Sequence, residues 1–81
     1  MLKMRAISNR SPQKVIGQLK AYFGDKGLGL KLVVDTDSRI VFRDTVGYVM
    51  TTFHIEDNQT SVIIETREWE YFVRRFLNGL D

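Results

Sequence analysis

One segment of the chain decides the fold: GYVMTTFHIEDNQTSVIIE, residues 47–65. Apolar, β-branched and aromatic residues are dense in both halves of this segment, a pattern typical of strands. It predicts one strand from Gly47 to Ile55 and another from Thr60 to Glu65. The connection Glu56–Gln59 is short, and strands joined so closely run antiparallel.

Two further strands are predicted before this segment. Every second residue of Leu28–Val34 is apolar, which predicts a strand with its leucines and Val34 on one face. After the polar turn Asp35–Ser38, a second strand is expected at Arg39–Arg43. The stretch Leu2–Ile7 also alternates, so it is either an additional strand or a frayed terminus.

Two amphipathic helices flank the strands. The first is predicted to begin at Ser11-Pro12, where serine caps a helix and proline suits the first position, and to end at Gly24. The second is predicted from about Arg67 to Leu80, with Thr66 as its N-cap. In both helices the apolar side chains share one stripe, as in a helix that lies on a core.

These elements predict an α+β domain with an antiparallel sheet of four to five strands in the order (β)αββββα. A chain of 81 residues has material for one core, so residues 1–81 are expected to form a single domain. The chain has no cysteine, which excludes disulfides and thiolate chemistry. With no apolar signal region and no stretch long enough to span a membrane, a cytoplasmic location is expected.

The charges are distributed unevenly along the chain. The formal net charge is +2, but residues 1–24 carry five bases and no acid, whereas residues 25–81 carry seven bases and ten acids. This asymmetry favours either an anionic partner or electrostatic complementarity between elements that pack together.

The residues needed for catalysis or metal binding are scarce. His54 is the only histidine, and no ligand spacing surrounds it. The pair Asp35 and Asp37 lacks the glycine and the distal glutamate of a calcium loop, and no serine lies in a nucleophile elbow. We therefore expect no enzymatic activity, no metal and no cofactor.

A binding surface is expected on the sheet. If both helices cover one face, the strand period leaves a moderately apolar opposite face, and such faces bind partners. That face would bind an apolar small molecule, a protein partner or a second copy of the chain. A curled sheet or a register one residue away would bury it instead. The predicted site residues are Lys31, Val41, Arg43, Tyr48, Met50, His54 and Ile63, with Val33, Thr52 and Arg39 beside them.

An alternative site would bind nucleic acid. Arginines three or four positions from a tyrosine on the last helix can hold a phosphate or stack on a base, and the basic amino-terminal third would add charge. The same residues also suit a cation–π contact and a Glu70–Arg74 pair on a solvated helix. The residues of this alternative are Arg10, Lys14, Arg67, Tyr71, Arg74 and Arg75.

Two segments, Ser11-Pro-Gln-Lys-Val-Ile16 and Thr66-Arg-Glu-Trp-Glu-Tyr-Phe-Val73, together with the strands between them, resemble a shortened helix-grip domain of the START and polyketide-cyclase-like superfamily. The resemblance implies a domain that binds an apolar molecule non-covalently between its last helix and its sheet. The lining that it implies is Trp69, Phe72, Val73 and Phe76.

The helix and strand order is also similar to that of the double-stranded-RNA-binding domain. That family has a lysine cluster at the start of its last helix. Here the corresponding stretch, Thr66–Glu70, contains two acids instead, so this resemblance does not extend to the residues that contact phosphate.

Overall fold

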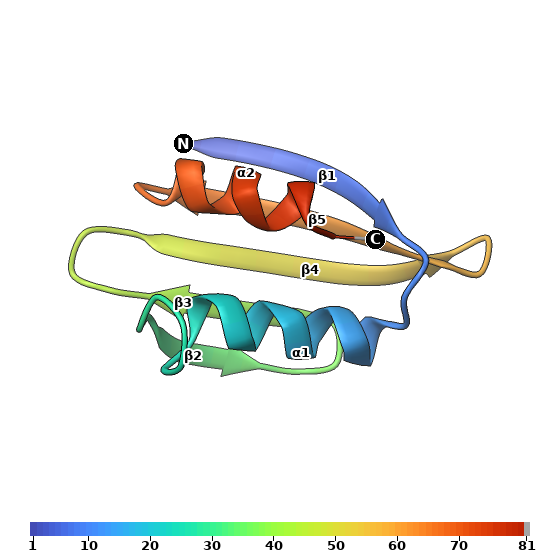
Figure 1. The fold of residues 1–81 in the computed structure, drawn as a ribbon, viewed down its shortest axis with the longest axis horizontal. Coiled ribbons are helices and arrows are strands. Elements are labelled where there is room, and N and C mark those ends of the chain that lie inside the picture. Colours follow the sequence, from blue (N-terminus) through green and yellow to red (C-terminus); the bar gives the residue numbers. More distant parts are fainter. Residues whose placement is uncertain (81) are drawn as a thin grey trace.

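The chain folds into one antiparallel sheet with both helices on the same side of it (Figure 1). A computed structural model describes residues 1–80. The α+β class and the strand-first order β-α-β-β-β-β-α are confirmed, and Leu2–Ile7 belongs to a strand. The elements are β1 (Leu2–Ser8), α1 (Pro12–Phe23), β2 (Lys31–Asp35), β3 (Arg39–Arg43), β4 (Tyr48–Glu56), β5 (Gln59–Arg67) and α2 (Glu70–Asn78).

The strands lie in the order β1-β5-β4-β3-β2, and every neighbouring pair is antiparallel. β4 and β5 form the hairpin predicted from residues 47–65. Its turn consists of Asp57 and Asn58, with φ angles of 54° and 63°. Asp and Asn tolerate this left-handed region, and a two-residue turn with both φ angles positive matches the twist of the flanking strands.

β1 and β2 form the two edges of the sheet. Between them in the chain, the loop after β1 crosses the sheet and α1 then runs lengthwise along the strands (Figure 1). The start of α1 is as predicted. The Ser11 Oγ accepts a hydrogen bond from the Lys14 backbone N–H at 3.3 Å, and Pro12 occupies the first turn.

The strand predicted from Leu28 is shorter than expected, because β2 begins only at Lys31. The backbone N–H groups of Leu28 and Leu30 instead donate to the carbonyl oxygens of Tyr22 and Phe23, each at 2.9 Å. These carbonyls belong to the last turn of α1 and have no partner within the helix. Residues 28–30 therefore cap α1, and Leu30 enters the core.

β2 also contains an irregularity that the alternation did not reveal. The register with β3 shifts between Leu32 and Val34, so that Val34 pairs with Val41. A bulge inserts one residue and moves the following side chains to the other face. The prediction that Val34 faces the core with the leucines was wrong for this reason.

The last helix begins at Glu70, not at Arg67. Thr66 is not its N-cap, since this residue lies in β5 and its hydroxyl donates to the carbonyl oxygen of Tyr48 at 2.7 Å. β5 continues through Arg67 because Tyr48 supplies a ladder partner there. Trp69 takes the N-cap position and makes no side-chain cap bond.

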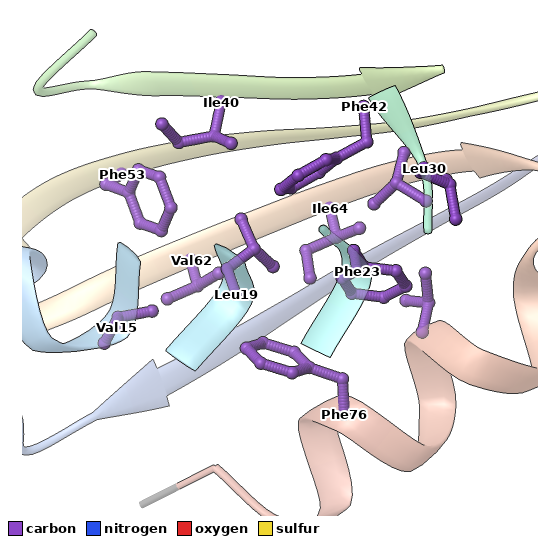
Figure 2. Packing of buried hydrophobic residues seen from close by; sticks show 12 residues of the cluster. Val15, Leu19, Phe23, Leu30, Ile40, Phe42, Phe53, Val62, Ile64 and Phe76 are labelled. Atoms are coloured by element: carbon purple, nitrogen blue, oxygen red, sulfur yellow. The ribbon is translucent and has the colours of Figure 1, made fainter. Parts of the chain in front are cut away.

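The core lies between the helices and one face of the sheet (Figure 2). The Phe23 ring of α1 contacts both the sheet and the second helix. The centroid of this ring lies 5.9 Å from that of Phe42 in β3 and 5.7 Å from that of Phe76 in α2. Each fully buried apolar side chain of this kind stabilises the fold by about 1.5–3 kcal/mol. The cluster consists of Val15, Leu19, Phe23, Leu30, Ile40, Phe42, Val49, Phe53, Val62, Ile64, Val73 and Phe76.

Candidate functional site

The face of the sheet that the helices leave uncovered carries the side chains that alternate with the core. We call it the open face. The strand register places on it the residues predicted for a sheet-face site: Lys31, Val41, Arg43, Tyr48, Met50, His54 and Ile63.

The centre of the open face is a trough made of two adjoining hollows. The larger, about 370 Å³, is lined by Val33, Val34, Arg39, Val41, Arg43, Tyr48, Met50 and Glu65. The smaller, about 180 Å³, is lined by Lys3, Met50, Thr52, Ile63 and Glu65. Because both hollows share Met50 and Glu65, the trough crosses the sheet from β1 to β2.

The trough has an apolar floor with polar groups at fixed positions. Tyr48 donates its hydroxyl hydrogen to Glu65 Oε2 at 3.0 Å. This bond to Glu65 raises the pKa of Tyr48, so the tyrosine remains a neutral donor. Nearby, an Nη2 of Arg39 lies 3.1 Å from the Met50 sulfur. These contacts orient the side chains that surround Val41.

His54 lies apart from the trough, in a polar cluster near the β4–β5 turn. Its Nε2 is 3.0 Å from Glu56 Oε2, and the Arg5 guanidinium donates to both oxygens of the same carboxylate at 3.0 and 3.1 Å. His54 and Arg5 together lower the pKa of Glu56. Of the seven predicted residues, His54 and Lys31 therefore do not line the trough, whereas the other five do.

The open face is strongly basic. Of the chain's 12 lysines and arginines, six lie on it, and within residues 1–80 it carries two acids, Glu56 and Glu65. Elsewhere, residues 1–80 carry six bases and seven acids. The six open-face bases are Lys3, Arg5, Lys31, Arg39, Arg43 and Arg67.

The centre of the open face is less exposed than the strand pattern indicated, although Val33 and Ile7 nearer its edges are 45% and 44% exposed. Val41, at the centre, is only 8% exposed. Arg39 and Arg43 flank it on its own strand, and long basic side chains cover apolar surface with their methylene stems. The surface offered to a partner is therefore a charged rim around a recessed apolar floor.

The alternative nucleic-acid residues do not form one surface. Arg67 lies on the open face opposite Tyr48, whereas Tyr71, Arg74 and Arg75 lie on α2 on the other side of the sheet. The Arg75 Nη1 donates to the Tyr71 hydroxyl at 3.1 Å, and its guanidinium lies 5.7 Å from the tyrosine ring centroid. Arg10 and Lys14 flank the start of α1.

The residues implied by the helix-grip resemblance belong to the core. Val73 is fully buried and Phe76 is 7% exposed, while Trp69 and Phe72 are half-buried and pack against the same cluster. The Trp69 Nε1 donates to Asp44 Oδ1 at 3.2 Å, which ties the start of α2 to the β3–β4 turn. These side chains fill the space between α2 and the sheet.

Residues 1–80 contain neither a metal-ligand cluster nor a membrane-spanning helix. No group of three or more His, Asp or Glu side chains there is arranged to hold a metal ion. In the same residues, neither helix has the length and apolar character needed to cross a bilayer.

No family model, curated protein or solved structure was found to match this chain. Its surfaces must therefore be interpreted from their own chemistry.

Part of the open face could not be predicted from the sequence. Lys3 and Arg5 were not assigned to the face because Leu2–Ile7 was left open between a strand and a frayed end. Their alternation with apolar residues was the available signal. The pairing of Arg5 with Ile63 and of Lys3 with Glu65 in β5 places both side chains on the open face. Nothing in the local pattern indicated Val34, since the bulge that turns it outward is set by pairing with β3.

Proposed function

We propose that the protein is a non-catalytic interaction module whose open face binds an acidic segment of another protein. The observation that carries the proposal is a largely apolar trough lined by Lys3, Arg39 and Arg43, on a face where residues 1–80 place six bases and two acids. Apolar side chains of the segment would occupy the floor at Val41, Met50 and Ile63. Its carboxylates would pair with the arginines of the rim, because a planar guanidinium can form two parallel hydrogen bonds with one carboxylate.

The charge of the face disfavours a second copy as the occupant. Stacking two open faces would bring the two sets of six bases together, and like charges across an interface weaken binding. An acidic segment has the opposite effect, because complementary charge steers association and raises its rate.

A single-stranded nucleic acid fits the trough less well. Such ligands stack their bases on exposed aromatic rings, whereas Tyr48 is half-buried and its hydroxyl is held by Glu65. The Glu65 carboxylate also lies within the trough, where it would repel a phosphate. The carboxylates of an acidic segment would be repelled in the same way, so they would lie at the rim with only apolar side chains beside Glu65, whereas a nucleic acid carries a phosphate at every nucleotide.

The test is a selection of short displayed peptides on the wild-type protein, after removal of those that also bind an Arg39→Glu/Arg43→Glu variant. We expect the recovered peptides to combine Asp or Glu with large apolar residues. A synthetic copy should shift the amide resonances of Val41, Met50 and Ile63, and the double variant should bind it roughly tenfold or more weakly.

A Lys14→Glu/Lys26→Glu variant provides the matched control, since it changes the net charge equally but lies outside the open face. It should retain binding within about twofold, because surface charges separated by more than a Debye length are screened at near-physiological salt. Equal loss in both double variants would show a non-specific charge effect and reject the proposal. So would tighter binding of a single-stranded oligonucleotide than of any recovered peptide.

A further inference from the structure

A second hollow lies between the two helices, away from the open face. We call it the interhelical groove. It has a volume of about 370 Å³, and its walls include Gln18, Ala21 and Tyr22 of α1 and Arg75, Phe76 and Leu80 at the end of α2. The Tyr22 and Phe76 rings meet with centroids 5.7 Å apart, which closes the groove between the helices.

The groove has the dimensions of a small-molecule site. Its α1 wall extends from Gln18 to Tyr22, about one helical turn or roughly 6 Å along the axis. A docked helix would need anchor positions over about two turns. The volume lies at the lower end of the range of about 300–1,000 Å³ found for small-molecule pockets.

Arg75 lies beside these apolar walls, and it has no carboxylate partner within residues 1–80. The ion pairs within residues 1–80 are Arg5–Glu56, Lys20–Asp35 and His54–Glu56, and none includes Arg75. Its guanidinium instead donates to the Tyr71 hydroxyl. Arginine is permanently charged in proteins, and the hydroxyls of Tyr71 and Tyr22 raise the pKa of Arg75 from its ordinary value. The remaining donors of its fork are suited to a carboxylate.

We infer that the interhelical groove binds a small organic carboxylate with an apolar body, such as a medium-chain fatty acid. The carboxylate pairs with Arg75, and the hydrocarbon lies against Tyr22, Phe76 and Leu80. This site is independent of the open face, because it uses other elements and the opposite side of the sheet.

The experiment is a titration of the full chain with sodium decanoate below its micelle concentration, followed by amide resonances. Decanoate should cause saturable shifts at Ala21, Tyr22, Gly79 and Leu80. Decan-1-ol, which has the same chain without the charge, should bind roughly tenfold more weakly. Shifts centred on Val41 and Met50 of the open face, or equal binding of the alcohol, would overturn the inference.

Two matched variants test whether the charge of Arg75 itself binds the carboxylate. Arg75→Gln should weaken decanoate binding roughly tenfold, whereas Arg74→Gln, its exposed neighbour outside the groove, should change it less than about twofold. Equal effects of the two variants would refute the assignment to Arg75.

A third variant, which fills the groove, tests the site without relying on Arg75→Gln, whose fold could be perturbed. Ala21 is exposed on α1, so Ala21→Trp places a ring over the groove without entering the core and should abolish binding. Unchanged binding in this variant would place the ligand elsewhere. The Arg39→Glu/Arg43→Glu variant should bind decanoate normally, so failure at one site is distinguishable from failure at the other.

Discussion

The two faces of the sheet are built from neighbouring residues of the same strands, yet they differ in almost every property. On β5, Ile64 is fully buried beneath the helices, whereas Ile63, the preceding residue, lines the trough of the open face. The covered face is an interlocked apolar core, and the open face is a basic rim around a recessed floor. The covered face contributes most of the burial that stabilises the fold, whereas the open face can carry charges, because only the covered face is sealed from water.

The difference is sharpest in the positions of charge. No Lys, Arg, Asp or Glu side chain belongs to the buried cluster within residues 1–80. On the open face, Glu65 pairs with Lys3 on one side and with Met50 on the other. A charge on a wet surface costs little, whereas an unpaired charge in the core costs several kcal/mol or shifts its pKa.

The largest expected effect comes from truncating the two isoleucines of β5 in turn. Ile64→Ala removes a fully buried side chain from the core and should lower the free energy of unfolding by about 2–5 kcal/mol. Ile63→Ala should lower it by about 1 kcal/mol or less, while weakening the selected acidic peptide. Chemical denaturation measures both. Similar losses for the two variants would show that the open face is also buried in the folded protein.

A smaller effect is expected from the threonines of β4. Thr51 is fully buried, and its Oγ1 has no hydrogen-bond partner within residues 1–80. Thr51→Val replaces that hydroxyl with a methyl group of similar size and should stabilise the protein by about 1 kcal/mol. Thr52→Val, the same change on the open face, should alter stability by less than about 0.5 kcal/mol. Destabilisation by Thr51→Val would reveal a buried partner for the hydroxyl.

The smallest effect is expected in the pH dependence of stability. Two carboxylates are compared, Asp44 of the β3–β4 turn and Glu56 of the open face. Burial alone would raise the pKa of Asp44, but hydrogen bonds from the Gly47 N–H, the Trp69 ring and the Val46 N–H outweigh it and lower that pKa below 3.8. The pKa of Glu56 is lowered below 4.5 by His54 and Arg5. A lowered folded-state pKa stabilises the fold above the unfolded value, and this contribution is lost as pH falls through the folded one.

The melting temperature should therefore fall less steeply below pH 4.5 in Asp44→Asn and Glu56→Gln than in the wild type. High salt should remove the difference for Glu56, whose partners are charged or exposed groups of the open face. It should leave the difference for Asp44, whose partners are neutral N–H donors. Loss of both differences in salt would mean that the Asp44 turn is held by long-range charge.

Local sequence patterns were sufficient to predict much of the fold and of the open face. Ser11-Pro12 marked the start of α1, and residues 47–65 predicted the central hairpin. The residues predicted for the open face also lie on it, because side chains alternate between the two faces of a strand and the apolar residues identified the buried face. The start of α2 was missed, since Thr66 has the chemistry of a cap but is held in β5 by its neighbours across the ladder.

By itself, the sequence determined most of the residues that are buried together, because hydrophobic periodicity can be read along each helix and strand. The exception is β2, where the bulge turns Val34 outward. Only the tertiary structure decided how charge is distributed. The six open-face bases come from β1, β2, β3 and β5, and they are separated by up to most of the chain. Strand order brings them to one face, and strand order depends on long-range pairing that no local pattern contains.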